Sequence, residues 1–377
     1  MNIVVPRETT PGESRVALTP TAAARLTAGG HSVHVEAGAG GDPFPDHLYK
    51  DAKAEIAPGA KATYRKAGVT LKVRKPTEAE IQLLPEGSAL IAFLQPLTSP
   101  DLVRALAKRK LTSFSLDAIP RITRAQSMDA LSSQATVAGY KAALIAADSI
   151  GKLFPMLMTA AGTITPARCL ILGAGVAGLQ AIATCRRLGG VVEAFDVRAA
   201  AKEEVKSLGA SFIELELETQ EGTGGYAKEQ SEEYLRRQRE LLAKHAAQAD
   251  VVITTALIPG RPAPILLTKE MVAGMKPGSV VVDIAAETGG NCELTEPGRV
   301  VVKHGVQIHG VINPAGMVPA VSSELYAKNL TNFLALLLKD GQLAVNFDDE
   351  IIKGSCITHA GEVVHEATRK AMGEKVA

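Results

Sequence analysis

The sequence has no excess of charge of either sign and no apolar run long enough to cross a membrane. Its 41 basic and 40 acidic residues give a formal net charge of +1, which argues against a general attraction to nucleic acid or acidic lipid. Long apolar stretches at residues 169–179 and 333–338 fall short of the roughly 20 residues that a spanning helix needs. The first residues run into Pro6-Arg7-Glu8 without the apolar core of a signal peptide. We therefore expect a cytoplasmic chain that does not itself enter the membrane.

Metal-binding patterns and an obvious acid–base residue are missing as well. None of the four cysteines forms a C-x-x-C pair or a spacing typical of zinc or disulfide frameworks. A dehydrogenase that oxidises an alcohol or an amine needs a positioned base, most often His or Lys. None of the eight histidines lies in a pattern that singles it out for this role. We predict no metal site and read the histidines as structural or solvated.

What the sequence does contain is a regular alternation of short apolar runs with longer helical patterns, which is typical of parallel β-α-β units. In the first third, strands are expected at residues 2–5, 32–36, 69–73, 90–94 and 113–116, and helices at 21–28, 46–52 and 102–109. A long helix is expected over 127–150. Beyond it the alternation repeats, with strands at 169–172, 191–195, 211–214, 251–254, 280–284 and 306–311 and helices at 177–188, 202–208 and 227–247.

This alternation predicts an α/β protein of two Rossmann-like, doubly wound domains. At 377 residues the chain exceeds the roughly 250–300 residues at which single cores stop growing. A strongly amphipathic helix at 322–338 suggests that the chain returns to the first domain. We therefore expect a first domain of residues 1–136 completed by 322–377, and a second domain of residues 137–321.

The strongest motif is a glycine turn in the second domain. Gly173, Gly175 and Gly178 form a G-x-G-x-x-G pattern directly after an expected strand and at the start of an expected helix, which makes a weak match useful. Gly173 permits the tight turn, Gly175 lets the backbone approach a pyrophosphate, and Gly178 allows close packing of helix on strand. The helix N-terminus adds free N–H donors for the anion. The alternative is a tight strand–helix turn without a ligand.

An acidic residue follows at the expected distance. Asp196 lies 18 residues after Gly178, at the end of the next strand, where a carboxylate can accept both hydroxyls of an adenosine ribose. The same carboxylate repels a 2′-phosphate, although the nearby Arg198 offers a charge that can neutralise one. The spacing therefore favours NAD over NADP.

The domain junction carries the densest cluster of polar side chains. If the long helix starts near Ser127, Asp129 and Ser132 share a face three residues apart, and Gln126 lies at its mouth. A neutral amide such as Gln126 can hydrogen-bond a nicotinamide carboxamide but cannot act as a base. The alternative is a solvated helix start with Ser127 as N-cap.

A glycine-rich segment follows the third strand of the second domain. Gly222, Gly224 and Gly225 precede Tyr226, which suggests a flap that closes over a bound nucleotide. Simple loop slack is the alternative.

Several of these segments resemble the soluble NAD(H)-binding domain I of proton-translocating NAD(P)+ transhydrogenase, which some bacteria carry as a separate alpha-1 subunit. The similarity runs from residues 6–8 to about residue 364. The matching segments are RITRAQSMDALSS at 121–133, GAGVAGLQAI at 173–182, GGYAKE at 224–229, TTALIPGRPAP at 254–264 and GGNC at 289–292.

The resemblance implies roles for individual residues. Those expected to line the nicotinamide end are Arg121, Gln126, Asp129 and Ser132, with Gln126 reaching towards the NADP-binding partner. Those expected at the adenosine ribose are Asp196, Val197 and Arg198. The remaining expected cofactor contacts are Val176 in the phosphate turn, Gly225 on the adenine side, Tyr226 in a closing loop, and Ser127, Met128 and Leu257.

The resemblance also implies the reaction and the partners. In that family, hydride passes directly between NADH and NADP+ held on two different protein domains, so no proton leaves a substrate. The implied partners are an NADP(H)-binding subunit and a membrane-spanning subunit that couples turnover to proton movement. The chain is then expected at the inner face of the cell membrane, as a homodimer, with no nucleic-acid partner.

Two other functions remain open. Alanine dehydrogenases resemble the chain in fold and in the segment at residues 15–20, but their catalytic Lys and His fall at Arg74 and Gln95. A guanidinium and an amide cannot shuttle protons at neutral pH. The second alternative is an NAD-sensing binding module without a redox role.

Overall fold

The structure is a computed structural model that describes residues 1–215, 232–258 and 260–373. The chain divides into two compact units. Unit 1 comprises Met1–Gln134 together with Val318–Ala377, and unit 2 comprises Ala135–Met317. The division expected from the sequence placed these boundaries after residues 136 and 321.

Unit 1 is built on a mostly parallel sheet. Its described strands are β1 (Asn2–Val5), β2 (Ser32–Glu36), β3 (Glu55–Ala57), β4 (Val69–Leu71), β5 (Ala89–Ala92), β6 (Thr112–Ser115), β18 (Cys356–His359) and β19 (Glu362–Val363). They run in the order β19-β18-β6-β5-β4-β1-β2-β3. The strands β1 to β6 are parallel in doubly wound order, as predicted. The C-terminal strands β18 and β19, which add an antiparallel edge beside β6, were not predicted.

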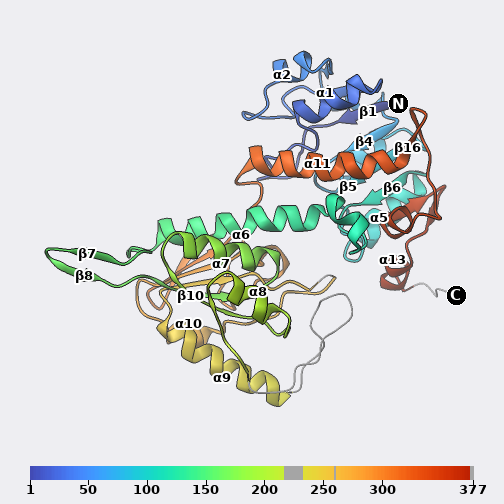
Figure 1. Ribbon diagram of the computed structural model, residues 1–377. Helices are drawn as coiled ribbons and strands as arrows, with labels where there is room; N and C mark the ends of the chain where they lie inside the picture. Colours follow the sequence, from blue (N-terminus) through green and yellow to red (C-terminus); the bar gives the residue numbers. More distant parts are fainter. Residues whose placement is uncertain (216–231, 259, 374–377) are drawn as a thin grey trace. The chain divides into compact units, whose positions relative to one another are not determined.

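Helices cover both faces of this sheet because alternate side chains of each strand point to opposite sides. Ala89 and Ile91 of β5 join one core, and Leu90 and Ala92 join the other. The first core contains side chains of α1 (Pro20–Ala28), α2 (Asp46–Asp51), α11 (Pro319–Leu337) and α12 (Glu350–Ser355), and the second those of α3 (Ala60–Tyr64), α4 (Glu78–Leu83) and α5 (Pro100–Lys108). A short helix, α13 (Glu366–Ala371), follows β19. The return of α11 to the first sheet confirms the expected crossing of the chain (Figure 1).

Unit 2 repeats the doubly wound order. Its described sheet strands are β9 (Arg168–Leu172), β10 (Val191–Phe195), β11 (Ser211–Phe212), β12 (Val251–Thr254), β13 (Val280–Asp283), β14 (Val300–Lys303) and β15 (Val306–Gly310). They run in the order β11-β10-β9-β12-β13-β15-β14. All pairs are parallel except β14 with β15. The antiparallel edge strand β14 was not predicted, because a short valine run beside a turn gives little local signal.

Helices again form a layer on each face of this sheet. The helices α7 (Val176–Arg187) and α8 (Ala201–Ser207) lie on one side, and α9 (Glu232–Gln248) and α10 (Lys269–Ala273) on the other (Figure 1). The strand β9 shows the alternation, since Ile171 packs with Ile182 of α7 whereas Leu172 packs with Leu242 of α9. The carboxyl end of β9 therefore lies between two helical layers, where ligands of such sheets bind.

Two further elements complete the chain. The helix α6 (Ala130–Ser149) leads from unit 1 into unit 2, and a hairpin of β7 (Leu157–Thr159) and β8 (Gly162–Ile164) extends from unit 2 beyond its sheet (Figure 1). A small pair, β16 (Leu338–Lys339) and β17 (Gln342–Leu343), follows α11. No helix in the described part of the chain is both long and apolar enough to cross a membrane. Within the same residues, no cluster of His, Cys, Asp or Glu side chains is arranged to hold a metal ion.

Candidate functional site

The glycine turn joins β9 to α7 at the point where the strand order of the second sheet reverses. Gly173 has φ +98°, a left-handed conformation that glycine adopts without steric cost. A Cβ on Gly178 would run into the carbonyl oxygen of Gly173. These two glycines are therefore required by the turn itself.

Gly175 differs from the other two glycines. It is the N-cap of α7 and has extended backbone with φ −70°, which any residue can adopt. A Cβ built on Gly175 meets no atom within 4 Å, so nothing in the protein explains why this position lacks a side chain. The space in front of the helix N-terminus is open, as an incoming pyrophosphate requires.

Asp196, one residue beyond β10, ties the two neighbouring strands of the site together. Its carboxylate accepts the backbone N–H of Ala174 at 2.7 Å. It also accepts the backbone N–H of Arg198 at 2.9 Å and the guanidinium of Arg198 at 3.0 Å. That guanidinium donates in addition to the carbonyl of Ala174 at 3.1 Å. The acid expected at the ribose is thus fixed directly beside the turn expected at the phosphates.

A pocket of about 200 Å³ lies beside Asp196. Its lining includes Val197, Arg198, Lys202 of α8, Glu214 just beyond β11, and Tyr234 of α9. Burial, together with the negative charge of Asp196, raises the pKa of the Tyr234 hydroxyl, which keeps that group neutral. The size and mixed lining suit an adenosine rather than a bulkier group.

A buried polar scaffold supports the turn from the β12 side, and the sequence did not reveal it. Asp283, at the end of β13, is fully buried and accepts the backbone N–H of Asn291 at 2.8 Å. The amide of Asn291 then exchanges two hydrogen bonds with the backbone of Ala256, both at 2.9 Å. The neighbouring Thr255 hydroxyl donates to the carbonyl of Gly173 at 3.0 Å. The only sequence signal for this scaffold was the GGNC segment that contains Asn291.

Two predicted contact residues flank this site with exposed side chains. Val176, the first residue of α7, is 42% exposed, and Leu257, in the loop after β12, is 50% exposed. Large apolar side chains that stay exposed beside an open turn are available to a ligand. Gly225 and Tyr226 lie outside the described residues, as does the start of the helix expected at 227–247.

The junction residues form a separate cluster in unit 1, and one expectation about them is wrong. The long helix does not start near Ser127, because a 3₁₀ helix covers Thr123–Met128 and α6 begins at Ala130. The N-terminal cap is Asp129 rather than Ser127, since the Asp129 carboxylate accepts the backbone N–H of Ser132 at 2.9 Å. It also accepts the Ser132 hydroxyl at 2.6 Å. The predicted pairing of Asp129 with Ser132 is present in the structure.

The other junction residues differ in how they present themselves. Arg121, Gln126 and Ser127 are exposed, and the carbonyl of Ser127 accepts the amide of Asn329 on α11 at 2.9 Å. Met128 is only 6% exposed and packs in the core of unit 1. A contact between Met128 and a cofactor would therefore have to come through its backbone.

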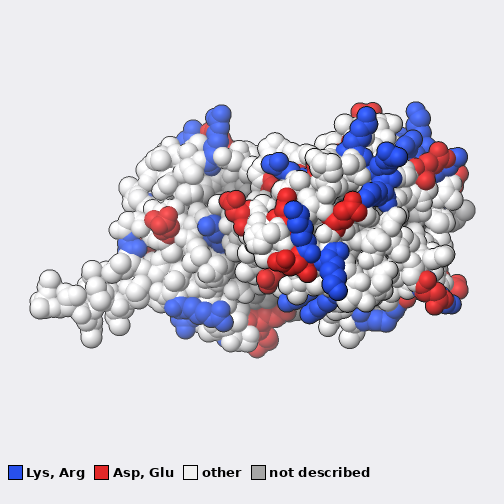
Figure 2. Space-filling model, turned by 90° about the horizontal axis from the view of Figure 1, so that it is seen from above, with Lys and Arg blue, Asp and Glu red and all other residues white. Residues whose placement is uncertain are grey.

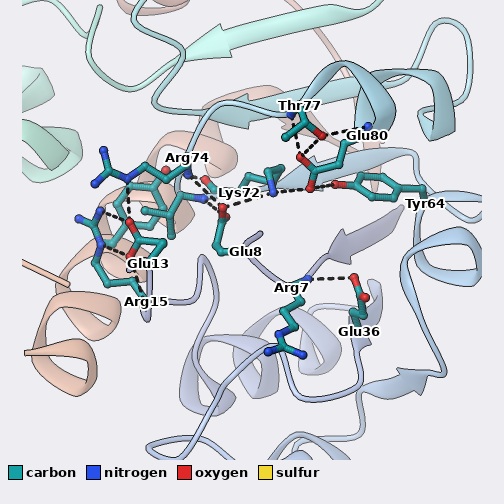
Figure 3. A network of polar contacts seen from close by, with 12 residues as sticks. Arg7, Glu8, Glu13, Arg15, Glu36, Tyr64, Lys72, Arg74, Thr77 and Glu80 are labelled. Atoms are coloured by element: carbon teal, nitrogen blue, oxygen red, sulfur yellow. Dashed lines mark hydrogen bonds and ion pairs between the residues drawn. The ribbon is translucent and has the colours of Figure 1, made fainter. Parts of the chain in front are cut away.

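In unit 1, charged side chains fill the corresponding switch point between β1 and β4 (Figure 3). The Lys72 ammonium is 1% exposed and lies 3.3 Å from Glu8 and 2.9 Å from Glu80. Burial raises the pKa of Glu8 against the opposing charge of Lys72. Where unit 2 leaves its switch point open for a ligand, unit 1 occupies the equivalent place with its own ion pairs.

A second ion cluster in unit 1 surrounds Glu13. Its carboxylate accepts the Arg15 guanidinium at 2.6 Å and the Arg74 guanidinium at 2.8 Å. Burial opposes ionisation of Glu13, but the hydrogen bonds and charge of Arg15 outweigh it and lower the pKa to about 2. Arg74 is thus held as a cation against a carboxylate (Figure 3).

The chain matches known proteins over nearly its whole length. Residues 4–138 match the family model "Alanine dehydrogenase/PNT, N-terminal domain", and residues 142–366 match "Alanine dehydrogenase/PNT, C-terminal domain". The first portion of the NAD(P) transhydrogenase alpha subunit of Rhodospirillum rubrum, a separate chain, is 50% identical, over 97% of this chain and 98% of that protein. A solved transhydrogenase from Sinorhizobium meliloti has 48% identity and a TM-score of 0.88, over 97% of this chain and 100% of that one. The alanine dehydrogenase of Bacillus subtilis is more distant, at 29% identity over 99% of this chain and 95% of that protein.

Proposed function

Because the chain belongs to the alanine dehydrogenase/PNT family, we propose that it is the NAD(H)-binding subunit of a proton-translocating NAD(P)+ transhydrogenase. The observation that carries the proposal is the open space at Gly175 beside the fixed carboxylate of Asp196. Together they offer a phosphate cradle and a ribose acceptor at one sheet edge, and the acid favours NAD(H) over NADP(H). The identity to transhydrogenase alpha subunits supports the choice of reaction.

The residues of this chain act by positioning. Bound NAD(H) supplies the hydride chemistry, and no group of the protein has to remove a proton from a substrate. The N-terminus of α7 holds the phosphates, and Asp196 accepts the ribose hydroxyls. Gln126, exposed at the start of the junction, orients the nicotinamide carboxamide through its neutral amide. Such alignment of two reacting rings is a sufficient source of rate acceleration.

The positions that would carry proton transfer in an amino-acid dehydrogenase are unsuited to it here. Arg74 is an always-protonated guanidinium bound to Glu13. Gln95 is an amide with φ +51° whose backbone N–H donates to Asp117 at 2.9 Å. Neither side chain exchanges a proton at neutral pH. These two positions argue against oxidation of an amino acid by the isolated chain.

The partners follow from the reaction. An NADP(H)-binding subunit has to present the second nicotinamide, and a membrane-spanning subunit has to carry the protons, which brings this chain to the inner face of the cell membrane. Lys, Arg, Asp and Glu are interspersed over the face in Figure 2, so no single-sign surface there points to nucleic acid.

Apolar surface on unit 2 supports a homodimer. The hairpin of β7 and β8 carries no charged side chain (Figure 2), and its Met158 is 74% exposed. On the edge strand β14, Val302 is 67% exposed and Val300 is 55% exposed. A hollow of about 520 Å³ between α6 and this edge is also lined by Ile312 and Met317. A second copy of the chain is the simplest cover for these surfaces.

One experiment separates the candidate functions. The purified chain is mixed with an NADP-binding transhydrogenase domain, and reduction of an NAD analogue by NADPH is followed. Rapid reduction that requires both proteins supports the proposal. Oxidation of L-alanine by the chain alone would instead indicate a dehydrogenase, and NADH binding without any hydride transfer would indicate a sensing module.

A further inference from the structure

The pocket beside Asp196 contains more charge than ribose recognition needs. Two acids and two cations line it, namely Asp196, Glu214, Arg198 and Lys202. They form two ion pairs. Arg198 donates to both oxygens of Asp196 at 3.0 Å and 3.2 Å, and the Lys202 ammonium lies 2.8 Å from Glu214.

The second pair is the unexplained one. Glu214 lies just beyond β11 and Lys202 on α8, so the pair spans the pocket wall rather than one helix. The hydrogen bond from Lys202 lowers the pKa of Glu214, and the hydrogen bond to Glu214 raises the pKa of Lys202. Each side chain is partly exposed, at 34% for Lys202 and 54% for Glu214. Neither is needed to fill a core.

Cations at this place usually decide between the two nicotinamide cofactors. An NADP-binding site of this fold accepts the 2′-phosphate on a basic residue near the end of the second strand. A phosphate monoester carries about −1.5 to −2 charges at neutral pH. Both cations of this pocket already have a carboxylate partner, so a 2′-phosphate meets two negative charges for every two positive ones.

We propose that Glu214 is a second specificity determinant of the site, which together with Asp196 excludes NADP(H) by holding and neutralising Lys202. The inference rests on the proposed binding of NAD(H) to this pocket. Asp196 rejects the phosphate directly at the ribose, whereas Glu214 removes the cation that would attract it. The remaining charges of α8 form their own pair, with Lys206 3.9 Å from Glu203, and do not line the pocket.

The test compares the Kd for NADPH and the Kd for NADH in Glu214→Gln. Freed from its partner, Lys202 becomes available to a 2′-phosphate, and the ratio of the NADPH Kd to the NADH Kd is expected to fall about fivefold. A double variant with Lys202→Met is expected to restore the original ratio. The matched control is Glu204→Gln, which removes the same charge from an exposed position on α8 outside the pocket.

Each outcome decides the matter. A ratio that stays unchanged in Glu214→Gln, or that changes equally in Glu204→Gln, overturns the role of Glu214. An equal loss of affinity for both cofactors also overturns it, since that indicates only a loosened pocket. Failure of the unmodified protein to bind NADH refutes the proposed function instead, and is seen before any variant is made.

Discussion

The guanidinium of Arg198 donates two hydrogen bonds to the carboxylate of Asp196, at 3.0 Å and 3.2 Å. With the backbone N–H of Ala174 at 2.7 Å, these contacts hold the acid in one orientation before any ligand arrives. A carboxylate that is already oriented loses little conformational freedom when it accepts ribose hydroxyls. The site is thus built in advance at its adenosine end.

Replacement of Asp196 by Asn tests the ribose role. Hydrogen bonds to a charged acceptor contribute about 1.5–3 kcal/mol each, so the NADH Kd is expected to rise by roughly 10- to 100-fold. The measurement is a fluorescence titration with NADH, with Glu203→Gln on the adjacent helix as control. An unchanged Kd in Asp196→Asn would contradict the assignment.

The two glycines at the start of α7 are expected to respond differently to alanine. In Gly175→Ala the new methyl group meets open space, so thermal stability should stay near that of the unmodified protein while NADH binding is lost. In Gly178→Ala the methyl group runs into the Gly173 carbonyl, which should cost about 1–3 kcal/mol of stability. Melting curves and NADH titrations of both variants check this. If Gly175→Ala binds NADH normally, the turn is structural only.

Replacement of Gln126 by Ala tests alignment at the nicotinamide. Gln126 is exposed on the 3₁₀ helix, so the variant should fold normally and bind NADH with similar affinity. Hydride transfer to the partner-bound cofactor is expected to fall by roughly 10- to 100-fold, because small misplacements of reacting atoms have large effects on rate. Stopped-flow transfer rates are compared with those of Thr123→Ala on the same helix. Equal losses in affinity and rate would speak against a role in alignment.

Glu13 should make stability depend on acid pH. Its pKa falls from an ordinary 4.5 to about 2 in the folded chain, so its contribution is full above pH 4.5 and disappears as the pH falls towards 2. Glu13→Gln leaves the buried guanidinium of Arg15 without its carboxylate, which should cost about 3–5 kcal/mol at pH 7.

Urea unfolding of Glu13→Gln and the unmodified protein at pH 7 and pH 3 measures this difference. The gap between the two proteins should narrow at pH 3. Glu86→Gln, which removes an exposed partner of Lys110, should change stability little at either pH. A gap for Glu13→Gln that is the same at both pH values would show that the charge of Glu13 is not the cause.

The sequence predicted those features of the structure that depend on local patterns. The doubly wound order and the glycine turn follow from strand and helix periodicity and from three glycines within six residues. The start of α6 was misplaced because Ser127 and Asp129 are both good caps, and only the hydrogen bonds show that Asp129 is used. The edge strands β14, β18 and β19 are too short to give a periodic signal.

Features that depend on distant contacts could not be read from the sequence. Asn291 reaches Ala256 only because β13 lies beside β12 in the sheet. Lys202 meets Glu214 only once α8 has returned the chain to β11. No spacing rule links such residues, because their separation along the chain is set by the elements between them and not by a motif.

The central claim is that NAD(H) binds to this chain through the glycine turn and Asp196. A titration of the purified protein with NADH, followed by the fluorescence of the reduced nicotinamide, tests it most directly. The account predicts saturable binding with one NADH per chain at submillimolar concentration. Absence of any complex at millimolar NADH would contradict it.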